Sequence, residues 1–118
     1  MEEKNKSVLR MAEERFGKAR LAEFKAAFND RPLNIIWAEG VDGKIKVALL
    51  QPLTPAALTS YCRCMAEDKM EIGNKRLIND LWIDGDEELR DETTEEYLSA
   101  VVQVMNIVEL KKSGFGKI

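Results

Sequence analysis

Two runs of alternating apolar residues, separated by a turn signal, constrain the fold of this chain more than any other feature. The first run spans residues 33–38 and the second spans residues 44–49, with the letters EGVDG between them. Asp42-Gly43 is a strong signal for a tight turn, so the two runs predict a β-hairpin over residues 33–51. A lone hairpin is marginally stable in water, and its apolar face must therefore pack on helices or on another strand.

The residues before the hairpin favour helix, but their apolar stripe changes direction along the chain. One stripe has helical spacing and consists of Leu9, Ala12, Phe16 and Ala19. A second stripe on a different bearing consists of Leu21, Phe24 and Phe28. Gly17 lies near the junction, and Pro32 disfavours helix at the residue before it. We therefore predict a kinked helix or two short helices within residues 1–32.

Two helices are predicted directly after the hairpin. Thr54 is a good N-cap and Pro55 suits the first helical position, so a helix begins there. The residues predicted to line its buried face are Leu58, Tyr61, Cys62 and Met65. The next helix is predicted over the letters MEIGNKRLINDLWI, with Ile78, Leu81 and Trp82 pointing inward.

A last helix is predicted from a capping box formed by Thr93 and Glu96. It runs through Lys112 to Gly114, a residue type that commonly ends helices. The predicted fold class is therefore α+β: an N-terminal helical segment, one β-hairpin, and three helices packed on it. We expect one domain over residues 1–118, with the helical part at 54–114, because 118 residues supply one modest core.

Composition excludes several classes of function. The chain has no His, which removes the usual general base, the usual zinc ligand and every Ser-His or Cys-His nucleophile. A net charge of −3 with dispersed basic residues disfavours nucleic acid as a partner. No apolar run approaches the roughly 20 residues that cross a membrane, and no secretory signal is visible. Cys62 and Cys64 are expected to be reduced thiols, which predicts a cytoplasmic protein.

The segment IDGDEELRDETTEE is strongly acidic and has three interpretations. A calcium loop is disfavoured, because the glycine and the closing glutamate do not stand at the required positions. A carboxylate enzyme would need four acidic residues to converge on a metal, namely Asp84, Asp86, Glu87 and Glu88. Acid–base catalysis by paired carboxylates needs burial to separate their pKa values, and this segment is too hydrophilic for that. We therefore predict a loop between two helices. No catalytic residue, metal or cofactor is therefore predicted, and we do not expect an enzyme.

The last predicted helix is apolar on nearly all sides. Such a helix is either central to a core or shared with a partner. The residues predicted to contact a protein partner, or a second copy of the chain, are Met65, Met70, Val101, Val104, Met105 and Val108. The alternative for each of these side chains is ordinary core packing.

The order of these motifs resembles small phage and prophage proteins of the tail assembly chaperone type. In that family a helix ends in a stretch similar to Trp-x-Gly-Gly-Asp-Glu-Glu, and an alanine-rich helix follows it. The matching residues here are Trp82, Gly85, Asp86, Glu87 and Glu88. Asp84 stands where the family has its first glycine. The resemblance covers about residues 44–114.

The resemblance implies a non-enzymatic function. Proteins of this family bind the long tape-measure protein and keep it soluble while the tail tube assembles. A frameshifted longer form, produced near Lys111 and Lys112, is a further expectation from the family. The alternative function is a small dimeric adaptor or regulatory protein of a mobile element that self-associates through its apolar last helix.

Overall fold

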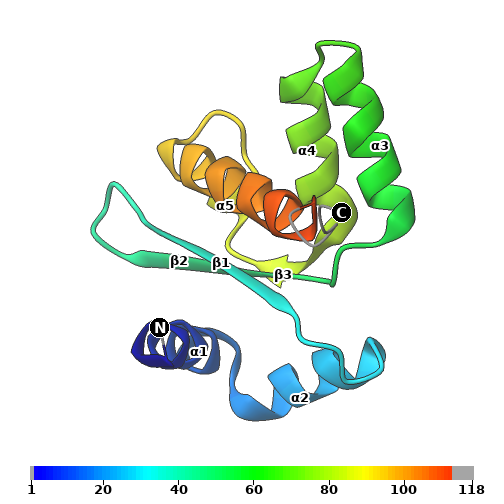
Figure 1. Ribbon diagram of the computed structural model, residues 1–118. Helices are drawn as coiled ribbons and strands as arrows, with labels where there is room; N and C mark the ends of the chain where they lie inside the picture. The colour runs from blue at the N-terminus through cyan, green and yellow to red at the C-terminus, as the bar shows by residue number, and fades with distance from the viewer. Residues whose placement is uncertain (1, 113–118) are drawn as a thin grey trace.

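The computed structural model describes residues 2–112, and side-chain positions are described for residues 7–108. Within the described part, five α-helices and a three-stranded antiparallel sheet confirm the predicted α+β fold class (Figure 1). In chain order the elements are α1 (Glu2–Phe16), α2 (Lys18–Ala27), β1 (Asn34–Glu39), β2 (Ile45–Leu50), α3 (Pro55–Ala66), α4 (Met70–Leu81), β3 (Trp82–Gly85), the short 3₁₀ helix η1 (Glu87–Leu89) and α5 (Glu95–Lys112).

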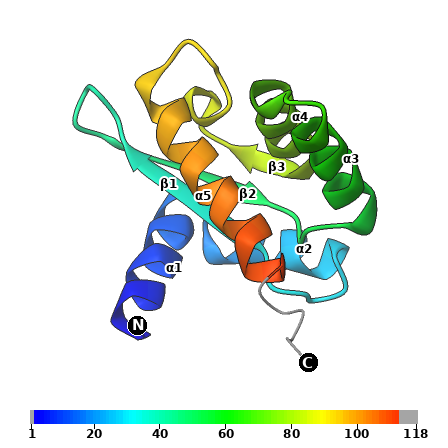
Figure 2. The ribbon, with the colours of Figure 1, turned by 45° about the horizontal axis from the view of Figure 1, so that its top comes forward.

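The predicted hairpin is present, with β1 and β2 paired so that Trp37 lies opposite Val47. Helices cover both faces of the sheet. The pair α1 and α2 lies on one face, and α3, α4 and α5 lie on the other (Figures 1 and 2). We call these the N-terminal face and the main face. Both faces of β1 and β2 are apolar because both are covered.

A third strand corrects the predicted loop between two helices. Trp82 was predicted as an inward-facing residue of the helix, but α4 ends at Leu81 and Trp82 begins β3. In β3, Trp82 lies opposite Leu50 of β2. Gly85 has a φ of +155° and lies so close to β2 that a Cβ there would stand 2.5 Å from the Cβ of Ala48. Only glycine fits this approach. A strand of four residues is too short to show a period of two in the sequence, so it was not predicted.

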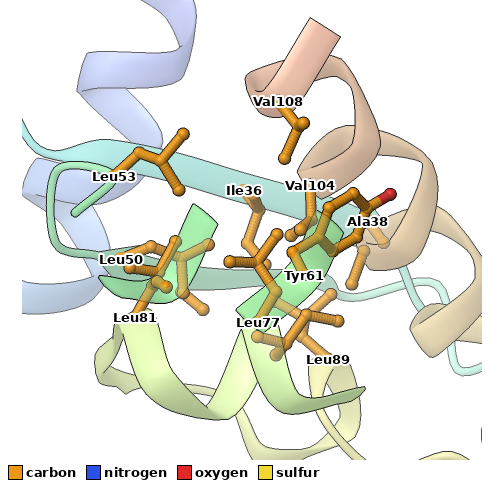
Figure 3. Packing of buried hydrophobic residues seen from close by; sticks show 14 residues of the cluster. Ile36, Ala38, Leu50, Leu53, Tyr61, Leu77, Leu81, Leu89, Val104 and Val108 are labelled. Atoms are coloured by element: carbon orange, nitrogen blue, oxygen red, sulfur yellow. The ribbon is translucent and has the colours of Figure 1, made fainter. Parts of the chain in front are cut away.

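The main face carries the larger core. Its members come mainly from β1, β2, α3, α4, η1 and α5, and they are drawn as sticks in Figure 3. The fully enclosed side chains include Ile36, Leu50, Leu77, Ile78, Leu81, Leu89, Val104 and Val108. On α3 the buried residues are Ala57, Tyr61 and Cys64, whereas the predicted Leu58, Cys62 and Met65 are half-buried. Gly73 lets α4 approach α3, since a Cβ there would lie 2.9 Å from the Cβ of Cys64.

The N-terminal face carries a small cluster. Its buried members are Ala12, Phe16, Val47 and Leu49. Gly17, with a φ of +85°, separates α1 from α2. Of the two predicted alternatives, a kinked helix or two short helices, the structure has the second. No residue of α2 is fully buried. The helix packs against this cluster through half-buried apolar side chains such as Phe24, whose ring meets that of Phe16 edge-on.

Helix starts agree with the sequence at α3 and differ at α5. Thr54 accepts a hydrogen bond from the backbone N–H of Ala57, as an N-cap should. In α5 the cap is Thr94, whose hydroxyl accepts the N–H of Tyr97, and the predicted cap Thr93 lies one residue too early. The side chain of Asp91 holds both the hydroxyl and the N–H of Thr93, so Thr93 is not free to cap. The predicted helix end at Gly114 lies outside the described residues.

Candidate partner-binding groove

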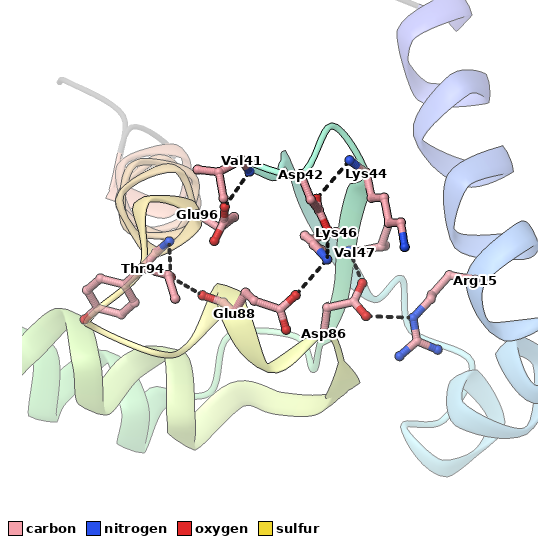
Figure 4. A network of polar contacts seen from close by, with 11 residues as sticks. Arg15, Val41, Asp42, Lys44, Lys46, Val47, Asp86, Glu88, Thr94 and Glu96 are labelled. Carbon is pink, nitrogen blue, oxygen red and sulfur yellow. Dashed lines mark hydrogen bonds and ion pairs between the residues drawn. The ribbon is translucent and has the colours of Figure 1, made fainter.

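The acidic segment holds the molecule together, and its carboxylates point in different directions. Asp84 pairs with Arg20 of α2 at 2.6 Å, and Asp86 pairs with Arg15 of α1 at 3.1 Å. The two glutamates pair elsewhere: Glu87 with Arg90 at 2.6 Å, and Glu88 with Lys46 of β2 at 2.9 Å. Figure 4 shows the two pairs made by Asp86 and Glu88.

Asp86 makes the most of these contacts. One carboxylate oxygen accepts the backbone N–H of Val47 at 2.8 Å, and the backbone N–H of Asp86 donates to the carbonyl of Val47 at 3.0 Å (Figure 4). Its other oxygen accepts from Arg15. The residue therefore continues the pairing of β3 with β2 and links the sheet to α1. Trp82 and Gly85 are the first and last residues of β3, and the guanidinium carbon of Arg90 lies 4.5 Å from the centre of the Trp82 ring.

Electrostatics in this region reflect local ion pairing. The hydrogen bond to Glu88, together with the nearby Asp42, raises the pKa of Lys46. The guanidinium of Arg90 lowers the pKa of Glu87. The four carboxylates of Asp84, Asp86, Glu87 and Glu88 each have their own cation. Within the described residues no three Asp, Glu or Cys side chains are grouped to hold a metal. We therefore do not place a chemical site in this segment.

A groove of about 470 Å³ lies between α4 and α5, two of the helices that cover the main face of the sheet. Two of the residues predicted to contact a partner line it, Met70 from α4 and Val101 from α5. Tyr97 and Leu98 complete its apolar lining and were not predicted. Leu98 is 66% exposed and Met70 is 51% exposed, so apolar surface is accessible on both walls.

The structure corrects two of the predicted contact residues. Val104 and Val108 are fully buried in the main core, because α5 lies against the sheet and turns these side chains toward Ile36 and its neighbours (Figure 3). They cannot form an accessible surface while the chain is folded. Met65 on α3 and Met105 on α5 are half-buried and do not line the groove.

The exposed apolar side of α5 is a different stripe. Leu98 and Val102, spaced four residues apart, stand on the same side of the helix, and Val102 is 59% exposed. Sequence reasoning missed them because an all-round apolar helix does not indicate which side the sheet covers. The available signal was the polar character of Ser99 and Gln103, which bounds this stripe on one side of the helix.

The rim of the groove is acidic. Glu71 and Glu92 line it, and Lys75 pairs with Glu92 at 3.1 Å. Burial raises the pKa of Tyr97, and the charge of Glu92 raises it further. Asn74 also lines the groove and is buried, and its side-chain oxygen has no hydrogen-bond partner among the described residues. The groove thus combines apolar walls, negative charge and one unpaired acceptor.

Comparisons of this chain with protein-family models, with curated proteins and with solved structures found no match. The resemblance to tail assembly chaperones accordingly stays a prediction from the sequence. Among the described helices, none is long and apolar enough to span a bilayer. The two cysteines are free thiols, with Cys64 buried and Cys62 half-buried.

Proposed function

We propose that this protein is a non-enzymatic binding protein that receives the apolar face of a partner helix in the groove between α4 and α5. The observation that carries the proposal is the exposed apolar lining of the groove, with Met70 on one wall and Leu98 on the other. Val102, one turn after Leu98 on α5, extends the exposed apolar side chains of that helix beyond the groove. Apolar side chains at helical spacing beside a groove are what helix-in-groove recognition uses. Val41 is more exposed, at 79%, but it stands at the hairpin turn, apart from the groove.

The charge of the groove favours one kind of partner. Glu71 lines the rim, and Glu92 is there as well, although Lys75 already pairs with it. On a chain with a net charge of −3, this rim favours a helix whose apolar stripe is flanked by Lys or Arg. The resemblance to tail assembly chaperones supports a client of this type, since a tape-measure protein is long and helical. The client would be kept soluble in the cytoplasm by covering its apolar stripe.

The test begins with the genes beside this one. We expect a gene for a long helical protein beside this one. That protein should be co-expressed with the wild-type chain and with a Leu98→Gln/Val102→Gln variant. We expect the wild type to keep that client soluble and to co-purify with it, and the double variant to lose both. Val41→Gln is the matched control, because it removes an exposed apolar side chain away from the groove and should behave as wild type.

Three outcomes would count against the proposal. A double variant that retains the client as the wild type does would show that the groove is not the binding surface. A gene neighbourhood without a long helical protein would remove the tail-chaperone assignment. A wild-type homodimer that the double variant dissociates, with no client bound, would establish the dimeric adaptor instead.

A further inference from the structure

The sheet has an open edge at β1, because the strand order is β1-β2-β3 and β1 has a neighbour on one side only. Gly40 and Lys44 close the hairpin by a hydrogen bond, so the even-numbered residues of β1 pair with β2. The backbone groups of Ile35, Trp37 and Glu39 therefore point away from the sheet. An edge of this kind is a template for pairing with another strand.

The side chain of Gln103 occupies the middle of this edge. Its oxygen accepts the backbone N–H of Trp37 at 3.0 Å, and its nitrogen donates to the carbonyl of Trp37 at 2.7 Å. One side-chain amide thus satisfies both groups, as one residue of an antiparallel neighbouring strand would. The same nitrogen also donates to the carbonyl of Ser99 at 3.1 Å, which fixes the amide on α5.

A second contact keeps α5 along this edge. Glu96, two helical turns before Gln103, accepts the backbone N–H of Val41 at 3.0 Å where the hairpin turns (Figure 4). Glu96 is 6% exposed although it is a carboxylate, which shows that this contact is enclosed. Two side chains seven residues apart on α5 therefore stand in place of a fourth strand.

The edge is covered at these two points but is not sealed by packing. A cleft of about 520 Å³ runs beside it between α1 and α5. Several of the side chains that the two helices contribute to the cleft are small or polar. The residues that line it are Ser7, Val8, Met11, Trp37, Ala38, Glu39, Ser99 and Gln103. Within the described residues, the outward backbone groups of Ile35 and Glu39 have no assigned partner.

We propose that the free edge of β1 is a strand-pairing surface that the Gln103 amide keeps closed, and that its partner, once the amide is removed, is β1 of a second copy. An antiparallel pair centred on Trp37 would place Ile35 opposite Glu39 of the other copy. The one charged side chain of the strand then meets no like charge, and the apolar and β-branched residues of NIIWAE favour strand pairing. This inference is independent of the groove between α4 and α5.

Removing the amide tests the proposal. Gln103→Ala should convert a chain that is monomeric at this edge into a concentration-dependent dimer, measured by light scattering on a sizing column. We expect self-association at least about tenfold tighter than in the wild type, because several backbone hydrogen bonds become available to a second strand. Asn106→Ala is the matched control: it shortens an exposed polar side chain on the same helix and should not associate more than wild type.

A second substitution identifies the surface that associates. Glu39 is exposed, and Glu39→Pro removes an outward N–H without breaking a bond to β2. The double variant Gln103→Ala/Glu39→Pro should be monomeric again. The double variant Gln103→Ala/Leu98→Gln should remain a dimer. A folded Gln103→Ala variant that stays monomeric would overturn the proposal. So would a dimer that Leu98→Gln dissociates and Glu39→Pro does not.

Hydrogen exchange on the wild type provides a test that does not depend on how the variant folds. The amide of Trp37 should exchange at least roughly fivefold more slowly than the outward amides of Ile35 and Glu39, because only Trp37 donates to a side chain on α5. Equal exchange at the three positions would show that Gln103 does not hold the edge closed.

Discussion

The two faces of the sheet are covered by helices to very different depths. On the main face, α3, α4 and α5 enclose a cluster of 14 buried residues (Figure 3). On the N-terminal face, α1 and α2 enclose a cluster of four, Ala12, Phe16, Val47 and Leu49. The same two strands, β1 and β2, supply side chains to both clusters, so the difference arises from the helices.

This contrast shows which part of the chain carries the fold. The main face has the apolar burial that a stable core needs. The N-terminal face relies on one buried aromatic ring and two ion pairs, one to Asp84 in β3 and one to Asp86 directly after it. Burial of a large apolar side chain contributes more free energy than a partly exposed ion pair. We therefore expect α1 and α2 to detach as a unit while the main face stays folded.

The largest effect should follow from a cavity in the main core. Ile78 is fully buried where α4 meets the sheet, and Ile78→Ala should lower the free energy of unfolding by about 2–5 kcal/mol. Urea denaturation followed by circular dichroism measures the change. A loss below about 1 kcal/mol would mean that the main core collapses around the cavity, and the contrast between the faces would weaken.

A cavity on the N-terminal face should have a smaller effect on the whole molecule. Phe16→Ala removes the only aromatic ring that is buried among the described residues of that cluster. We expect α1 and α2 to lose protection from hydrogen exchange while α4 and β2 keep theirs, and global unfolding to change less than in Ile78→Ala. Equal loss of protection in all four elements would show one cooperative unit instead of two.

Asp86 connects the two faces, and its substitution should have an intermediate to small effect. Asp86→Ala leaves the N–H of Val47 without its acceptor and removes the partner of Arg15, which should cost about 1–3 kcal/mol. Asp86→Asn retains an acceptor and loses the charge, so it should cost less than about 1 kcal/mol. If both variants lose the same stability, the charge matters and the hydrogen bond does not. Thermal melting at low and high salt separates the two contributions.

The smallest effect concerns Tyr97 at the edge of the main face. Burial and the charge of Glu92 raise its pKa above the ordinary value of 10.0, so the folded state keeps the neutral phenol where the unfolded state has begun to ionise. The resulting stability is complete below pH 10.0 and is lost as the pH rises toward the folded-state pKa. Absorbance titration of the phenol should show Glu92→Gln lowering that pKa. Tyr97→Phe has no phenol to ionise, so it should lose less stability than the wild type at high pH. An unchanged pKa of Tyr97 in the Glu92→Gln variant would contradict this account.

Much of the fold follows from local sequence patterns. The alternating runs around Asp42-Gly43 specify the hairpin, and Thr54-Pro55 specifies the start of α3. The change of stripe at Gly17 indicates a break in direction, as a kinked helix or two short helices, and the structure has two helices. Each pattern acts over a few residues, through turn geometry, backbone freedom or a cap, and needs no knowledge of distant contacts.

The candidate sites depend on contacts between distant residues. Gly85 is a strand residue only because β2 lies beside it. One side of α5 packs against the sheet, and for that reason Val104 is buried while Leu98 is exposed. Gln103 reads in the sequence as one polar residue on an apolar helix, and its two bonds to Trp37 join residues 66 positions apart. The sequence by itself determined which segments are helix and hairpin, because local propensity and period are written in neighbouring residues. The tertiary structure alone decided which apolar surface stays open and which strand edge is closed, because burial is a property of what packs against a side chain.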